Sequence, residues 1–179
     1  MEIKLLSNDT EKIWDKLIQQ SPFCRFSETT NFKNVLKETY YYKPNYLLIK
    51  NQGQIIALLP AVRKNKKLIS MPFADYGDLI IINPIVSPAE IVQALKNFLQ
   101  EKNINYLKII SGLNIQSSSL QKHFQKQPND SRAVLILDKD PDSLFKKFDY
   151  SVRKAIKKSE SANLKCSQNN SHKSMQNHF

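Results

Sequence analysis

The feature that most constrains the fold is a run of five apolar residues, Ile55 to Leu59. The run reads Ile-Ile-Ala-Leu-Leu, and Asn51-Gln52-Gly53 before it has the composition of a hairpin turn. A strand built from such a run is apolar on both faces, and this is stable only where both faces of the sheet are covered. The sequence therefore predicts a sheet with cover on each side.

The surrounding pattern gives the order of the elements. Two helices are expected over residues 11–20 and 27–39, and strands over residues 44–50, 54–62, 68–71 and 79–82. The clearest helix starts at Ser87-Pro88-Ala89-Glu90, a capping box with proline at the first helical position. After it, strands are expected over residues 106–110 and 132–137. Helices are expected over residues 117–125, 140–148 and 151–159. This order predicts an α/β fold, α+β-like with a mixed sheet, in one domain over residues 1–166. The polar residues 167–179 are expected to be a disordered tail.

Composition excludes several classes of protein. Hydrophobic residues make up 41% of the chain, enough for a core, yet no run of about 18 apolar residues predicts a membrane span. The N-terminus lacks the apolar segment of a signal peptide, and Cys24 and Cys166 are isolated, so a reduced, cytoplasmic protein is expected. The three histidines have no metal-ligand spacing, so no metal site is predicted. Only three glycines occur and no two are close, which excludes a P-loop or dinucleotide fingerprint.

The stretch over residues 70–78, Ser-Met-Pro-Phe-Ala-Asp-Tyr-Gly-Asp, is the first candidate site. Pro72 and Gly77 prevent continuation of either flanking strand. Between them, Asp75 and Tyr76 are residue types that bind polar ligands. Two interpretations stay open from these residues alone: a structural loop, which is the commoner case, and a binding site at a sheet edge.

The second candidate site is the predicted helix over residues 151–159. The net charge of the chain is +11, and six basic residues with a single acid lie between Lys146 and Lys158. A field of this sign attracts phosphates. Arg153 and Lys157 are one turn apart on a single stripe, opposite a side expected to be buried. The stripe is either a solvated basic face or a clamp for phosphate or carboxylate.

These two stretches resemble motifs of the FemAB-like proteins, a branch of the GNAT acyltransferase fold. Residues 70–77 are similar to an S-L-P-F-x-D-Y-G segment, and residues 153–159, Arg-Lys-Ala-Ile-Lys-Lys-Ser, are similar to a later R-x-x-I-R-K-A helix. Residues 55–60 resemble a G-x-L-P strand, and residues 26–35 resemble an aromatic entry helix. The resemblance covers residues 14–166, and it implies a GNAT-like acyl-CoA N-acyltransferase fold.

The resemblance also implies an activity. Family members transfer an amino acid from aminoacyl-tRNA to an amine of a peptidoglycan precursor, and others are thought to acylate sugars. The amine attacks an activated carbonyl, and positioning with oxyanion stabilisation supplies most of the catalysis. The implied acyl donor, aminoacyl-tRNA or acyl-CoA, is a co-substrate, and no tightly bound cofactor is expected. The implied partners are a phosphorylated cell-wall or sugar precursor and tRNA.

The substrate-binding residues implied by the resemblance are Asp75, Tyr76, Arg153 and Lys157, and Lys37 on the far face of the second helix is added to them. No catalytic residue is predicted. Two departures from the family stand out: Asp78 follows Gly77 where many members have a second glycine, and the second GNAT-like domain is missing. A truncated chain, or one with a separately encoded C-terminal half, is therefore expected. Two alternatives to an acyltransferase stay open: a non-catalytic basic module that binds tRNA or a phosphorylated precursor, and an inactive fragment.

Overall fold

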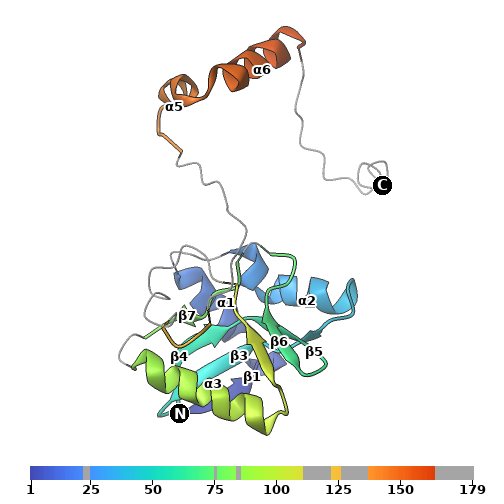
Figure 1. Cartoon of the computed structure of the whole chain (residues 1–179), viewed down its shortest axis with the longest axis vertical. Coiled ribbons are helices and arrows are strands. Elements are labelled where there is room, and N and C mark those ends of the chain that lie inside the picture. Colours follow the sequence, from blue (N-terminus) through green and yellow to red (C-terminus); the bar gives the residue numbers. More distant parts are fainter. Residues whose placement is uncertain (22–24, 75, 84–85, 111–121, 126–136, 164–179) are drawn as a thin grey trace. The chain divides into compact units, whose positions relative to one another are not determined.

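The fold is described from a computed structural model of residues 1–179 (Figure 1). It describes residues 1–21, 25–74, 76–83, 86–110, 122–125 and 137–163. These fall into two compact units, Met1–Pro128 and Asn129–Phe179, which are treated separately below. Asp75, both cysteines, the tail over residues 167–179 and most of the helix and strand expected over residues 117–137 lie outside the described residues. The domain boundary expected at residue 166 stays a prediction.

The described part of the first unit contains two four-stranded sheets. The first has the order β1-β3-β4-β7 and the second β2-β5-β6-β8. The first sheet is antiparallel throughout, whereas β6 and β8 of the second sheet run parallel. The strand bounds are β1 Glu2–Leu5, β2 Lys43–Pro44, β3 Leu47–Asn51, β4 Gln54–Leu59, β5 Ala61–Lys64, β6 Lys67–Ser70, β7 Ile80–Ile81 and β8 Tyr106–Lys108. The predicted class, an α/β fold with mixed strand directions, is confirmed.

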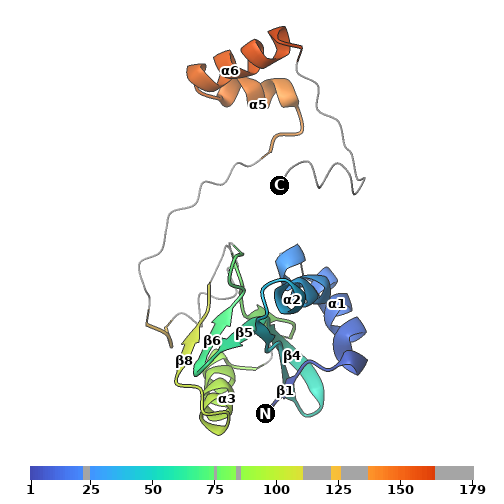
Figure 2. The same ribbon diagram turned by 90° about the vertical axis from the view of Figure 1, so that its right-hand side faces the viewer.

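Helices cover both faces of the first sheet, as the apolar run predicts. Figure 2 shows α1 and α2 on one side of the strands and α3 on the other. Leu47 and Ile49 of β3 join the core under α3, while Leu48 between them joins the core under α1 and α2. The helices are α1 Glu11–Gln20, α2 Thr30–Glu38 and α3 Pro88–Glu101, with short 3₁₀ turns η1 Asn8–Thr10 and η2 Phe26–Glu28.

The prediction of one strand over residues 54–62 is wrong. The chain passes from β4 in the first sheet to β5 in the second sheet at Pro60. Proline has no backbone N–H for a ladder hydrogen bond, so the pairing of β4 ends there. Ala61 then begins a new ladder with Ser70 of β6. This change of sheet brings the end of β6, and the loop after it, beside the core under α1 and α2.

The second unit, as far as it is described, consists of α5 Pro141–Lys147 and α6 Tyr150–Ser161. Asp140 caps α5 through its carboxylate, which accepts hydrogen bonds from the backbone N–H groups of Asp142 and Ser143. Neither helix contains a buried residue. Within this unit Val152 is 43% exposed and Ile156 is half-buried, and the buried side expected for residues 151–159 stays a prediction.

Candidate functional site: a pocket between the Met71–Asp78 loop and η2

The loop after β6 is fixed by hydrogen bonds to the segment that follows β8. Gly77 N–H donates to the carbonyl of Ile110 at 2.7 Å, and Ile110 N–H donates to Ser70 Oγ at 2.7 Å. A Cβ atom at Gly77 would lie 2.7 Å from Cβ of Met71, so only glycine fits this crossing. Met71 and Phe73 have positive φ angles of 36° and 67°. The loop therefore holds a strained backbone in place, a feature that often accompanies binding sites.

The other wall of the site comes from η2 and the residue before it. Glu28 is buried, and its backbone carbonyl accepts a hydrogen bond from the Trp14 indole N–H at 2.8 Å. Its carboxylate accepts from the backbone N–H of Arg25 at 3.3 Å, which closes a capping box across η2. Trp14 also packs against Tyr46, with ring centroids 5.0 Å apart. The short 3₁₀ turn is thus anchored in the core under α1 and α2.

One guanidinium joins the two walls. Arg25 Nη1 lies 3.2 Å from Glu28 Oε1 and 3.6 Å from Asp78 Oδ2. Its Cζ atom lies 4.4 Å from the centre of the Tyr76 ring, a cation–π distance. The Glu28 and Asp78 side chains are 1% and 2% exposed, whereas that of Arg25 is 25% exposed. Two buried carboxylates therefore hold the inner side of an arginine whose outer side reaches the surface.

Glu28 has a shifted proton affinity. Burial raises the pKa of its carboxyl from 4.5 to about 7, the nearby Arg25 charge opposes this rise, and the Asp78 carboxylate adds to it. Burial also raises the pKa of Tyr46, which stays neutral at physiological pH. A buried carboxyl that changes charge near pH 7 beside a cleft is a common mark of a functional site.

A pocket of about 380 Å³ opens beside this cluster. Its lining combines Arg25 with aromatic and small side chains, namely Phe26, Ser27, Phe32, Phe73, Ala74 and Tyr76. A pocket with apolar walls and a few polar groups at one end is the usual form of a site for a small ligand. Arg25, Ser27 and Tyr76 are the polar residues of this lining.

Exposed aromatic rings form the rim of the pocket. Phe73 is 67% exposed and stacks on Tyr40 at a centroid distance of 5.0 Å. On the η2 side, Phe26 is 64% exposed and meets Phe32 edge to face at 5.7 Å. Contiguous apolar side chains at the surface can mark a site where a ligand or a partner binds. The rim therefore supports the interpretation of this pocket as a binding site.

The structure places the predicted site residues in different settings. Tyr76 lines the pocket, while Asp75 lies outside the described residues. Lys37 is exposed near the end of α2 and is not part of the pocket lining. Arg153 and Lys157 lie on α6 in the second unit, where Arg153 Nη1 donates to the carbonyl of Lys146 at 3.3 Å. Binding by these five residues stays a prediction.

Sequence reasoning missed the Arg25, Glu28 and Asp78 cluster. In the sequence Asp78 stands out only as the last residue of the candidate stretch and as a departure from a family pattern, although a carboxylate lies there directly before the apolar residues 79–82. Arg25 within Phe-Cys-Arg-Phe carries a similar signal, a charge inside an apolar stretch. Each signal is weak alone, because only the fold brings Asp78 to Arg25.

The described residues contain neither a metal-binding cluster nor a membrane-spanning helix. No group of three or more His, Cys, Asp or Glu side chains in the described part of the chain is placed to hold a metal ion. Among the same residues, no helix has the length and apolar character needed to cross a membrane.

Comparisons with known proteins complete the description. No protein-family model matches the sequence, and no curated protein matches it. The chain aligns with the apo crystal structure of aminoglycoside antibiotic 6'-N-acetyltransferase AAC(6')-IG from Acinetobacter haemolyticus, at 20% identity over 77% of this chain and 100% of that one, with a TM-score of 0.42. It also aligns with a crystal structure of a probable acetyltransferase, at 7% identity over 78% of this chain and 100% of that one, again with a TM-score of 0.42. Both TM-scores lie below 0.5, so the proposals that follow rest on the residues of this chain.

Proposed function

We propose that this chain serves N-acyl transfer by binding the acceptor. The acyl or aminoacyl group would pass to an amine of a cell-wall or polysaccharide precursor, as in the FemAB-like and GNAT-type proteins whose motifs the sequence resembles. The observation that carries the proposal is the position of Tyr76. This residue belongs to the segment that resembles the family motif, and it lines a pocket of ligand size beside a buried charge cluster.

The reaction defines what the pocket must do. A neutral amine attacks the carbonyl of the donor, a C–N bond forms, and the C–O bond of an aminoacyl ester or the C–S bond of an acyl thioester breaks. The amine loses a proton and the leaving group gains one. Holding the acceptor in a fixed orientation supplies a large part of such catalysis. The aromatic and polar residues of the pocket lining suit this positioning role, and no described residue is assigned to the proton transfers.

An acyl-transfer assay tests the proposal. The full chain, alone and with any separately encoded C-terminal half, is incubated with labelled acyl-CoA or aminoacyl-tRNA and an amine-bearing precursor. The Tyr76→Ala variant is expected to lose transfer by at least about tenfold, because one wall of the pocket is removed. Tyr41→Ala is the matched control, since Tyr41 is 88% exposed and does not line the pocket. Absence of transfer from every donor in both preparations would refute the proposal.

The second candidate function is a basic module that binds tRNA or a phosphorylated precursor through α6. The charge of this helix favours it: Lys154 and Lys157 are exposed, and within the described residues neither has an ion-pair partner. Binding through such lysines weakens steeply with salt. Titration of labelled tRNA at two salt concentrations, with the Lys154→Glu and Lys157→Glu variants, separates the candidates. An affinity that salt does not change would eliminate this one.

The third alternative, an inactive fragment, predicts a poorly soluble chain of low thermal stability, because apolar surface would stay uncovered. A thermal melt of the purified full chain tests it. A single cooperative transition, together with transfer or binding in the assays above, would exclude the fragment.

A further inference from the structure

We propose that Arg25 binds an anionic group of the ligand, a carboxylate or a phosphate, and that protonation of Glu28 frees the guanidinium for this contact. The inference rests on the proposed function, because it assigns a chemical group to the ligand of the same pocket. The site predicted from the sequence for such a group, Arg153 with Lys157, lies in the other unit.

The geometry orients Arg25 toward the pocket. Both ion pairs of its side chain use the single nitrogen Nη1, whereas a guanidinium carries five N–H donors in a planar fork. The Tyr76 ring covers one face of the fork at 4.4 Å. A stacked and anchored arginine loses little side-chain entropy when it binds, and its fork matches carboxylate and phosphate oxygens. The remaining edge of the fork belongs to a residue that lines the pocket.

The charge of the cluster decides when an anion can bind there. With both carboxylates ionised, Arg25, Glu28 and Asp78 sum to one negative charge, which repels an anion. With Glu28 protonated, the sum is zero and one carboxylate fewer competes for the guanidinium. Among the described residues, the charged and titratable groups that face Glu28 are Arg25 beside η2, Asp78 from the loop and Tyr46 just before β3. Burial raises the pKa of Glu28 to about 7, whereas Tyr46, whose pKa burial also raises, stays neutral.

The consequence is anion binding that strengthens as pH falls. Burial raises the pKa of Glu28 to about 7, so the carboxyl is mostly protonated at pH 6 and mostly ionised at pH 8. If only the protonated form binds, the apparent affinity falls by up to about tenfold between these pH values. An anion whose own charge is constant between pH 6 and pH 8 cannot cause this dependence by its own protonation. A pH dependence measured with such an anion therefore comes from the protein.

The experiment uses two such anions with the full-length chain. N-acetyl-alanyl-alanine is the carboxylate probe, and inorganic sulfate, which keeps its charge from pH 6 to pH 8, represents a phosphate group. Affinities are measured by calorimetry at both pH values, with the amidated dipeptide as the uncharged control. Binding of the dipeptide alone identifies the group as a carboxylate, binding of sulfate alone as a phosphate, and either must be tighter at pH 6 for the proposal to hold.

Two variants separate the roles. Glu28→Gln keeps the size of the side chain and removes its titration, so binding should stay at the pH 6 level at both pH values. Arg25→Gln should abolish binding, while Arg63→Gln, whose arginine lies on β5 and bonds to the carbonyls of Asn65 and Lys102, should leave it unchanged. Since Arg25→Gln also removes the ion pairs that Arg25 makes with Glu28 and Asp78, its fold is checked by circular dichroism. If the Arg25→Gln variant unfolds, Glu28→Gln carries the test.

Three outcomes would overturn the inference: no binding of either probe, equal binding at pH 6 and pH 8 by the unmodified chain, or an unchanged pH dependence in Glu28→Gln. The test needs no acyl donor and is therefore independent of the transfer assay. Anion binding of the expected pH dependence without any transfer would refute the proposed function and leave this inference standing. Acyl transfer without anion binding would refute this inference and leave the proposed function standing.

Discussion

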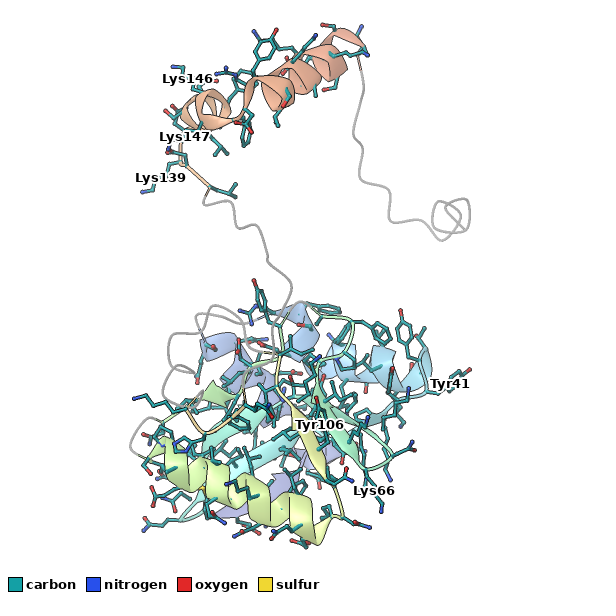
Figure 3. The ribbon with its side chains drawn as sticks, in the orientation of Figure 1. Tyr41, Lys66, Tyr106, Lys139, Lys146 and Lys147 are labelled. Carbon is teal, nitrogen blue, oxygen red and sulfur yellow. The ribbon has the colours of Figure 1, made fainter. Side chains whose placement is uncertain are left out.

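The pocket region and the α5–α6 helices carry the two sequence motifs, and they differ in what holds them. The loop before Asp78 and the turn η2 are anchored by buried groups: Glu28 is 1% exposed, and the indole of Trp14 bonds to its carbonyl. The α5–α6 helices contain no buried residue. Figure 3 labels Lys139, Lys146 and Lys147 around them, all of which are exposed. A shape fixed by burial can select a ligand, whereas an exposed basic face attracts anions with little selection.

The largest difference between the two regions is expected when a buried side chain beneath the pocket is truncated. Trp14→Ala is expected to destabilise the chain by about 3–5 kcal/mol, because it removes a fully buried ring and its hydrogen bond to Glu28. Val152→Ala on α6 is the matched change and should lie within about 0.5 kcal/mol, since Val152 is 43% exposed. Urea unfolding monitored by circular dichroism measures both. Equal losses would show that the two regions are buried alike.

The pH dependence of stability tests the Glu28 environment. The folded pKa of about 7 is higher than the ordinary value of 4.5, so between these values the folded chain binds more protons than the unfolded chain. The free energy of unfolding should therefore fall as pH rises from about 4.5 to about 7, by at most roughly 3 kcal/mol at about 1.4 kcal/mol per pKa unit. Chemical denaturation at pH 5, 6 and 7 follows this loss.

Glu28→Gln is the control for that series, because it removes the titrating group. Its stability should change less over the same range than that of the unmodified chain. If the free energy of unfolding changes equally with pH in the unmodified chain and in Glu28→Gln, Glu28 does not titrate in this range. The raised pKa of its carboxyl would then be wrong.

Gly77 tests the crossing that shapes the loop. Gly77→Ala should cost about 1–3 kcal/mol, since the new Cβ would lie 2.7 Å from Cβ and 2.8 Å from Cγ of Met71. Gly53→Ala should cost about 1 kcal/mol from its positive φ of 81° alone, because nothing lies within 4 Å of the added atom. Thermal melts of the two variants compare them, and a milder effect at Gly77 than at Gly53 would contradict the close contact.

The smallest effect is expected in the α5–α6 helices. Asp140→Ala removes the side chain that caps α5, so the backbone amides of Asp142 and Ser143 should exchange faster with solvent. The exchange of amides in β3 should not change. Hydrogen exchange followed by mass spectrometry or NMR measures both, and a loss of protection in β3 would show that this cap supports the sheet.

Much of the secondary structure was predictable because it depends on local pattern. The capping box at Ser87 and the proline after it predicted α3, whose N-cap hydrogen bonds are present as expected. The strand expected over residues 68–71 corresponds to β6, which pairs with β5 from Lys64 to Lys67 onward. The candidate site was predicted only in part. Tyr76 lines the pocket, but the carboxylates that hold its arginine partner were not among the predicted binding residues.

The sequence by itself determined that this chain builds a sheet covered on both faces, because an uninterrupted apolar run is stable only between two layers of cover. The tertiary structure decided where the sheet divides, since Pro60 ends one ladder and the next ladder depends on strands distant in the chain. It also decided the site. Arg25 and Asp78 are far apart in sequence, and their contact follows from the packing of η2 against the loop after β6, which no local pattern encodes.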